Sequence, residues 1–427
     1  MLNILYLFQN KRISLAFLVF QVMLVVILIL PNHIYAENIT LSRAIKLTLN
    51  KNPELKVYQF RDKSLNGEIQ TAGLTPGYVL GANIDSLGGS NAENNPANPN
   101  FGITLSSVIE LGGKRDARVQ MVNAKRSKLQ VARETTALDL MAEVMRRYIA
   151  ILAAQERIKV AIQAQGIAQD TLDTVKKRVT SGISPMADMK RAMARLSQEK
   201  LSVIKERQQL KYLRSALSML WGDKTPNFTY VAGNLYQIGP EFTFQDLYDQ
   251  AINSPDIALF AADRRLREAE LQLIETQSTP DVDWTVGLSQ YTALDYPVLV
   301  AGVSVPLFTT QRNKGAIESA TAAGEITTVT KESALLNLHT QLYHAYQNRK
   351  QAILTIRALQ DEIIPLLKES LKQTRSYYQL GRYSYLELIT VSKELITAYQ
   401  SLIKTATDLL LYNTEIERLT GQSIFIN

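Results

Sequence analysis

Few residues of this chain are placed to do chemistry. There is no cysteine, which excludes disulfides, thiolate metal ligands and thiol nucleophiles together. His339 and His344 are five residues apart, so they do not share one helical face as residues four apart would. The sequence has no nucleophile motif, no phosphate-binding glycine loop and no clustered pair of acids. It therefore predicts no enzyme, no cofactor and no metal site.

Two carboxylates, Asp188 and Glu387, have a repeated setting. Each stands six residues after a glycine, Gly182 or Gly381, and these glycines are 199 residues apart (381 − 182 = 199). Each acid falls early in a predicted helix, where negative charge interacts favourably with the helix dipole. The setting predicts either a solvated acid that stabilises a helix start or an acid with a function of its own.

These glycines belong to a repeat that spans most of the chain. The matched signals, in chain order, are Asn52-Pro53 with Ser254-Pro255, Pro76-Gly77 with Pro280, and Leu111–Arg115 with Leu307–Arg312. In such a protein one repeat need not close a hydrophobic core alone. The structural unit is therefore half of the chain.

Composition and the N-terminus limit the class of protein. The 427 residues are 46% hydrophobic and 20% charged, which is typical of folded protein. Removing Lys11 and Arg12 from the formal charge of +7 leaves 7 − 2 = +5, too weak and scattered to favour nucleic acid. These two residues precede an uncharged run at 13–30, which predicts a secretory signal peptide at 1–36. An uncleaved membrane anchor is the alternative, because the run is long enough to span a bilayer.

Four segments of about ten residues alternate apolar with small or polar side chains. They lie at about 77–87, 101–110, 281–291 and 298–307. A wall between lipid and water requires this period of two, and about ten residues cross a bilayer when tilted. A half-buried sheet in a soluble protein shows the same alternation. If the strands are membranous, four cannot close a barrel, so several chains must contribute.

The remainder is helix of unusual length. From residue 115 to residue 180 there is no proline, apolar residues keep a three-four spacing, and a second such run follows residue 312. Return helices after the glycine turns supply antiparallel coiled-coil partners, and Pro365 should kink or break the second long helix. The predicted organisation is a signal peptide at 1–36, a first repeat at 37–221 with a helical hairpin at about 114–221, a linker at 222–242, a second repeat at 243–422 with a hairpin at about 312–420, and a tail at 423–427.

This layout resembles the TolC-like outer membrane efflux proteins over about residues 40–422. The motifs that carry the resemblance are Leu41–Pro53, Ile109–Arg115 and Leu380–Leu388, each weak alone but specific in their order and duplication. The resemblance implies a mainly α fold with a transmembrane β-barrel, in which a homotrimer pools its strands in one barrel and its helices in a periplasmic tunnel. It further implies an exit duct embedded in outer membrane lipid of a Gram-negative bacterium.

The resemblance also implies functions for the two glycine turns. In relatives these turns form the periplasmic tip, where an adaptor, the membrane fusion protein, docks and where the tunnel is closed at rest. The candidate docking residues are Ser181, Gly182, Ile183, Leu380 and Gly381. A plain helix C-cap is the alternative interpretation of the glycines.

Pore and gate candidates follow from the same resemblance. In relatives an acid at the place of Glu387 faces the pore, where three copies would ring the aperture with negative charge and favour cations. The acid at the place of Asp188 takes part in contacts that hold the closed state, and Tyr378 matches a gate tyrosine.

The chain departs from the family pattern at two positions. Tyr383 stands where an arginine is expected, although the adjacent Arg382 is a candidate substitute. Thr390 stands in place of a second pore acid. The sequence alone therefore leaves the gate contacts open.

The segment at 383–388 and the lack of a lipidated cysteine look most like the family branch paired with heavy-metal exporters. This predicts a passive channel for metal cations, served by an inner membrane pump of the resistance-nodulation-division type. Efflux of drugs or small organic solutes is the alternative. Two other classes stay open: a periplasmic adaptor, which carries one hairpin between compact β domains, and a coiled-coil protein anchored by its leader.

Overall fold

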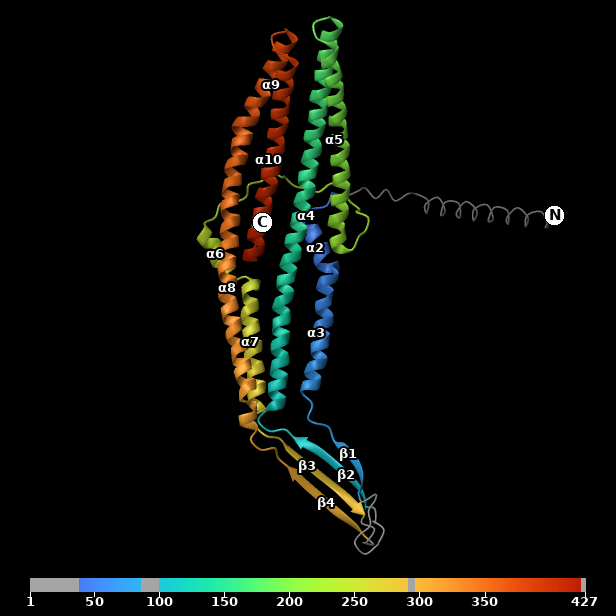
Figure 1. The fold of residues 1–427 in the computed structure, drawn as a ribbon, viewed down its shortest axis with the longest axis vertical. Coiled ribbons are helices and arrows are strands. Elements are labelled where there is room, and N and C mark those ends of the chain that lie inside the picture. Colours follow the sequence, from blue (N-terminus) through green and yellow to red (C-terminus); the bar gives the residue numbers. More distant parts are fainter. Residues whose placement is uncertain (1–37, 86–99, 291–295, 424–427) are drawn as a thin grey trace, which may run out of the picture.

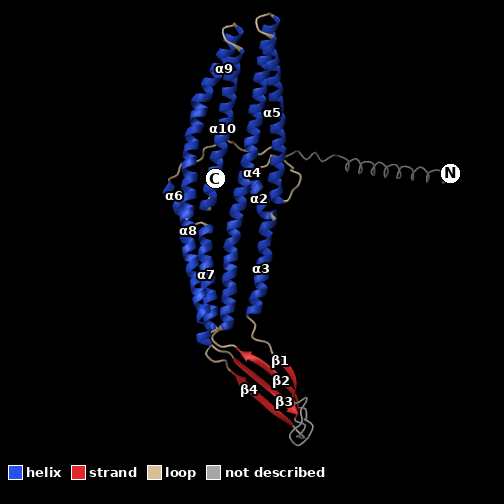
Figure 2. Cartoon of the chain, viewed as in Figure 1, coloured by secondary structure: helices blue, strands red, loops and turns tan. Residues whose placement is uncertain are grey.

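The computed structural model describes residues 38–85, 100–290 and 296–423. The predicted signal peptide at 1–36 and most of the predicted tail lie outside the described residues. The chain is elongated, with a four-stranded sheet at one end, two helical hairpin turns at the other and long helices between them (Figures 1 and 2). In these ranges no helix is both long and apolar enough to cross a membrane.

The first repeat contains two short helices, two strands and one long hairpin. Its elements are α2 (Leu41–Lys51), α3 (Pro53–Ala72), β1 (Val79–Asp85), β2 (Asn100–Ile109), α4 (Lys114–Thr180), α5 (Met186–Ser218) and the 3-10 turn η1 (Met219–Trp221). Asn52 ends α2 and starts α3, because its side-chain oxygen accepts a hydrogen bond from the Glu54 N–H at 2.8 Å. Pro53 follows at the first helical position, where no donor is needed. With 67 residues, α4 is about 100 Å long.

The second repeat has the same order of elements. They are α6 (Phe244–Ala251), α7 (Pro255–Thr276), β3 (Val282–Gln290), β4 (Pro297–Ser304), α8 (Thr309–Ala358), the π turn η2 (Leu359–Ile363), α9 (Ile364–Gln379) and α10 (Tyr385–Thr420). The π turn comes directly before Pro365, which has no N–H for the carbonyl four residues earlier. The long helix therefore contains one wider π turn before this proline and then continues as an α-helix.

The sheet is antiparallel in the order β1-β2-β3-β4, and β2 against β3 joins the two repeats. The register places Leu105 opposite both Leu80 and Val286, and Leu299 opposite Leu288. One face is therefore apolar except for Ser107 and Gln290. Its exposed side chains are Leu80, Ile84, Phe101, Ile103, Leu105, Val286, Leu288, Leu299 and Val303.

The opposite face carries small and polar side chains. A Cβ atom added to Gly81 would lie 2.8 Å from Thr104 Oγ1, and one added to Gly287 would lie 2.7 Å from Thr104 Cγ2. Glycine is needed at position 287, where an added Cβ atom would also lie 2.5 Å from the carbonyl oxygen of Ile103, a backbone atom that cannot move aside. The small face is the crowded one, and the apolar face is open.

Each long helix packs against several neighbours. In the half near the sheet, α4 lies beside α3 and α7; in the half near the turns, it lies beside α5 and α10 (Figure 1). The largest buried cluster joins α4, α8 and α10 around Ile151, Ile356 and Leu409, none of which is exposed. The heptad spacing of these apolar residues thus builds a helix layer rather than a compact globule.

The segment at 222–242, predicted as a linker, lies across the helices near their middle (Figure 1). Tyr148 donates hydrogen bonds to the carbonyls of Ile39, at 3.0 Å, and Ala232, and Ile39 pairs with Val231 in a parallel bridge. Phe228 and Val231 are each only 4% exposed, so this segment contributes to the core.

Arg349 fixes the end of this segment to the bundle. It is 4% exposed and donates to Asn413 Oδ1 at 2.6 Å and to the carbonyls of Ile238 at 3.2 Å and Pro240 at 2.6 Å. Its guanidinium also lies 4.3 Å from the ring centroid of Phe242. This arginine, which interrupts an apolar heptad, is therefore a buried cation with three hydrogen bonds.

Arg349→Ala should lower the free energy of unfolding by about 3 kcal/mol, because it leaves the buried Asn413 Oδ1 and the carbonyls of Ile238 and Pro240 without their donor. Denaturant unfolding in detergent would measure this loss, and limited proteolysis should show faster cleavage within 222–242. Arg264→Ala is the matched control, since Arg264 is 68% exposed and pairs only with Glu268 on its own helix. Equal stability of the two variants would contradict the role given to Arg349.

Candidate functional site at the hairpin turns

The two hairpin turns have the same backbone structure. Gly182 and Gly381 adopt φ values of 72° and 81°, in the left-handed region that favours glycine. The Gly182 N–H bonds the carbonyl of Val179 and the Ile183 N–H that of Arg178, at 3.0 and 2.9 Å. The second turn repeats both bonds at the same distances, from Gly381 and its successor. Both turns are therefore Schellman caps, which satisfy the last carbonyls of α4 and α9.

The turns lie side by side at the end of the molecule away from the sheet (Figure 1). All five docking candidates, Ser181, Gly182, Ile183, Leu380 and Gly381, are exposed. Ile183 is 63% exposed and Leu380 is 69% exposed, so each turn presents one large apolar side chain to solvent.

Arg178, in the last turn of α4, connects the two hairpins. Its Nη1 donates to the carbonyl of Tyr378 at the end of α9, and its Nε donates to Ser184 Oγ at 3.0 Å. The guanidinium also lies over the Tyr378 ring, 4.5 Å from its centroid. One cation thus bonds its own turn and both the backbone and the ring of the other hairpin.

Tyr378, the gate candidate, is buried rather than free. It is 1% exposed and packs in a small cluster with Val175, Ala192 and Leu388, which come from α4, α5 and α10. Its hydroxyl is buried and has no hydrogen-bond partner among the described residues. In this chain Tyr378 therefore anchors the contact between the hairpins through its ring and carbonyl.

A second, weaker contact joins the two hairpins farther from the turns, between α4 and α9. Arg375 Nη2 lies 3.1 Å from Asp170 Oδ2, and the Asp170 side chain is 60% exposed. Exposed pairs of this kind contribute about 0–1 kcal/mol, less than a charged donor to a buried carbonyl does. Arg178 is therefore the stronger of the two links.

Glu387 forms the N-terminal capping box of α10. The Ser384 N–H and hydroxyl bond Glu387 Oε2 at 2.6 and 2.8 Å, and the Glu387 N–H bonds Ser384 Oγ at 3.3 Å. The bond from the backbone N–H, followed by that from the hydroxyl, holds the pKa of the Glu387 carboxyl below its usual range. The acid is exposed and charged, and it also fixes the geometry of the turn.

The other candidates are not brought into one contact. Asp188 is half-buried in the first turn of α5, and its charge adds to burial in raising the pKa of Tyr385. Arg382 is exposed, and its side chain makes no hydrogen bond or ion pair with the described residues. The Tyr383 ring lies 5.4 Å from that of Tyr377.

Arg178 is the residue that the sequence analysis missed. It stands four residues before Gly182, and its counterpart four residues before Gly381 is Tyr377. A cation in one repeat opposite an aromatic residue in the other is a signal that comparison of the two repeats could have found. The contact itself depends on how the hairpins lie side by side, which one sequence does not specify.

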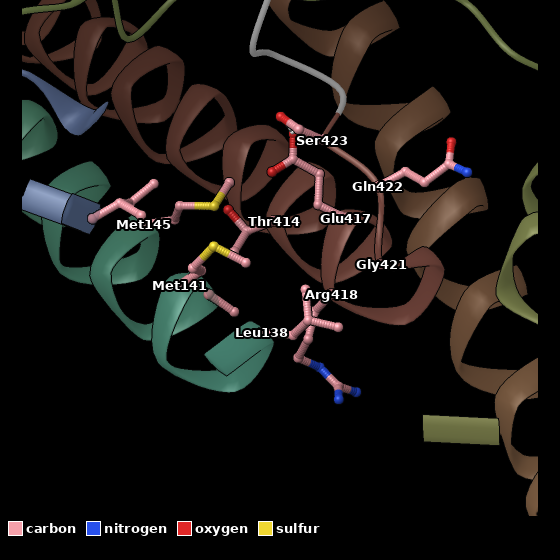
Figure 3. Close-up of a pocket in the computed structure, with 11 residues that line it drawn as sticks. Leu138, Met141, Met145, Thr414, Glu417, Arg418, Gly421, Gln422 and Ser423 are labelled. Atoms are coloured by element: carbon pink, nitrogen blue, oxygen red, sulfur yellow. Dashed lines mark hydrogen bonds between the residues drawn. The ribbon is translucent and has the colours of Figure 1, made fainter. Parts of the chain in front are cut away.

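A partly open pocket lies far from the turns, where α4, α2 and the end of α10 meet (Figure 3). Its volume is about 60 Å³, and Met141, Met145, Thr414 and Glu417 are among its lining side chains. Room for a few water molecules makes it a packing gap between helices rather than a solute site. The described residues contain no group of three histidine or acidic side chains that could hold a metal ion.

Comparison with known proteins decides the family. A family model described as "Outer membrane efflux protein" matches residues 44–223 and 247–422. The chain belongs to this family. As an outer membrane efflux protein it is 24% identical, over 91% of both chains, to the cobalt-zinc-cadmium resistance protein CzcC of Cupriavidus metallidurans. It is 21% identical to the cation efflux system protein CusC of Escherichia coli, over 62% of this chain and 60% of that one.

Solved structures agree on the fold of this efflux protein. A crystal structure of CusC superimposes with a TM-score of 0.73 at 17% identity, over 90% of this chain and 92% of that one. The TolC-like fold predicted from the sequence, mainly α with four strands per chain, is therefore confirmed.

Arg178→Gln should loosen the contact between the hairpins, because it removes a charged donor and a cation–π contact worth about 1–2 kcal/mol each. Spin labels on Ser181→Cys and Leu380→Cys, in a chain with no other cysteine, would report the distance between the turns. We expect a broader and longer distance distribution for Arg178→Gln. Arg382→Gln is the control, and identical distributions for the two variants would rule out the link.

Proposed function

We propose that this protein is the outer membrane channel of a tripartite efflux system and conducts heavy-metal cations passively to the exterior. The observation that carries the proposal is the apolar face of the sheet, which no other described residues cover, in a member of the outer membrane efflux family. Leu80, Leu288 and Val303 are 75%, 56% and 73% exposed on this face. Such a surface suits contact with lipid.

A homotrimer would complete the sheet. Within the described residues β1 and β4 each pair on one side only, and open edges are not tolerated in hydrocarbon. Three copies would supply 3 × 4 = 12 strands, with the crowded small face inside and the apolar face towards lipid. The helices would then continue into the periplasm of a Gram-negative bacterium as a tunnel.

The exposed turns suit the docking of a periplasmic adaptor. Ile183 and Leu380 each present an apolar side chain next to a rigid glycine cap at the same end of the molecule. Helical hairpins of an adaptor could pack between such turns, as coiled-coil helices pack against one another. The inner membrane pump, of the resistance-nodulation-division type, would then choose the substrate.

The names of the relatives support metal cations as substrate. The relative matched over 91% of its length is a cobalt-zinc-cadmium resistance protein, and the other is a cation efflux protein. The exposed, charged Glu387 fits a cation path if three copies bring it around the aperture.

Deleting the gene should lower the resistance of the host to divalent cations such as cobalt, zinc and cadmium, and plasmid expression should restore it. Growth inhibition across a panel of metals and organic drugs would measure the effect. Sensitivity to drugs alone would replace the metal assignment with efflux of organic solutes. Normal resistance throughout, in a host without a second channel of this family, would contradict the efflux role.

Glu387→Gln should reduce cation selectivity in single-channel recordings, because it removes the negative charge at each copy of the turn. Glutamine at the third helical position can still bond the Ser384 N–H, so this variant keeps the cap. Glu387→Ala loses both charge and cap, and comparison of the two variants separates electrostatics from turn structure. Unchanged selectivity in Glu387→Gln would remove Glu387 from the conduction path.

A further inference from the structure

The junctions between sheet and helices follow the internal repeat residue by residue. Arg118 in α4 donates from Nη2 to the carbonyl of Leu74 at 3.2 Å. Asn313 in α8 bonds the segment that precedes β3, donating to the Ser278 hydroxyl at 3.0 Å. The spacing from Arg118 to Asn313 is 313 − 118 = 195, and that from Leu74 to Ser278 is 278 − 74 = 204. These two offsets identify equivalent positions in the two repeats.

Within the chain, the junction that leads from β2 into α4 packs against the junction that leads from α7 into β3. Asp281 accepts the Leu111 N–H at 3.1 Å and pairs with Lys114 Nζ at 2.6 Å. Next to this pair, a Cβ atom added to Gly112 would lie 2.7 Å from Thr279 Oγ1. We call this polar, close contact between the two repeats the inner seam.

Within the part of the chain that the structure describes, the equivalent segments at the two edges of the sheet make hydrogen bonds only inside their own repeat. They are 306–309, which leads from β4 into α8, and 74–77, which leads from α3 into β1. By the offsets, Pro306 replaces Leu111 and has no N–H, and Gly77 replaces Asp281 and has no carboxylate. Both partners of the polar contact are therefore missing together.

Large apolar side chains stand at these edges instead. Leu307, at the position of Gly112, is 70% exposed, and Phe308, at the position of Gly113, is 72% exposed. Across the sheet, Leu74 is 65% exposed. Compared with the inner seam, the two outer segments thus carry less charge and more apolar area. This difference is expected if the segments are buried against each other between copies.

Phe308 is also conformationally strained. Its φ is 63°, and within the described ranges no other residue except glycine has a positive φ. Its counterpart Gly113 has a φ of 75°, so the fold needs this conformation at the start of both long helices. A bulky residue persists in this region only where the surrounding structure compensates for the strain, and the described residues leave the ring 72% exposed.

We propose that Leu307 and Phe308 of one copy pack against residues 74–77 of the next copy and form an apolar outer seam between chains. The occupant is a second copy, because the repeat places a protein segment at the equivalent position of the inner seam and because β4 and β1, which run into these segments, end the sheet with unpaired edges. Polar seams within chains then alternate with apolar seams between chains. This inference rests on the proposed homotrimer.

Cysteine cross-linking tests the seam, because the chain has no cysteine of its own. Leu307→Cys with Thr75→Cys, treated in native membranes with a short bismaleimide, should give covalent dimers and trimers on denaturing gels. Leu111→Cys with Thr279→Cys is the control on the inner seam, where cross-links should stay within one chain. The mass of the uncross-linked protein in detergent, measured by light scattering, reports the trimer independently.

The outcomes separate the inference from the proposed function. A trimer with intermolecular cross-links supports the outer seam. A trimer that gives none overturns the seam and leaves the channel intact, and quenching of a fluorophore on Phe308→Cys by brominated lipid would show that this site faces lipid instead. A monomer overturns both the seam and the trimer.

A substitution at Phe308 gives a second measurement. Phe308→Gly relieves the backbone strain but removes the ring, so the chain should fold normally while its trimers dissociate roughly tenfold faster in heated detergent. Phe308→Tyr keeps the ring and should dissociate like the parent. Trimers of Phe308→Gly that last as long as those of the parent would contradict the proposal.

Discussion

The constraint on which this structure depends is an antiparallel sheet that leaves its apolar face exposed and its edge strands unpaired. Among the residues that the structure describes, no helix or second sheet lies against its apolar face, and β1 and β4 each lack a partner on one side. A soluble domain would cover such a face with a second layer. Here the helices instead extend away from the end of the sheet (Figure 1), and the apolar side chains of the sheet stay exposed. The long helices, the repeat and the outward-facing leucines all fit the homotrimer in lipid that we propose.

The opposite end of the molecule meets a different constraint. Two separate hairpins must end at the same level and stay together, with little core around them. The structure does this with matched Schellman caps and with Arg178, whose guanidinium reaches the carbonyl and ring of Tyr378. The contact is short-range and involves few residues, so the hairpins can separate at a modest cost while the core around Ile151 stays intact.

Much of the fold could be predicted from the sequence, because hydrophobic periodicity identifies the elements and the positions of proline and glycine mark their ends. The alternation in the four strands, the proline-free runs and the glycine turns each have a direct structural cause, and the family match and superposition confirm the TolC-like fold. The site was less accessible. Ser384 and Glu387 form a capping box whose spacing was visible, but Arg178 has no motif, since its partners are a carbonyl and a ring on another hairpin. Arg349 looked like an interruption of a heptad, and only the packed structure reveals its three acceptors.

The π turn before Pro365 sets how the side chains of α9 are rotated about the helix axis. One residue more than an α turn needs rotates the following helix by about 100° relative to an uninterrupted one. Tyr378 lies fifteen residues beyond the end of this turn (378 − 363 = 15), so the direction in which its ring points is decided there. Helix α8 can thus keep its apolar side chains towards α10 while α9 presents Tyr378 to Arg178. A change of chain length by one residue would be absorbed at this turn, whereas anywhere higher it would swing the ring out of reach of the arginine.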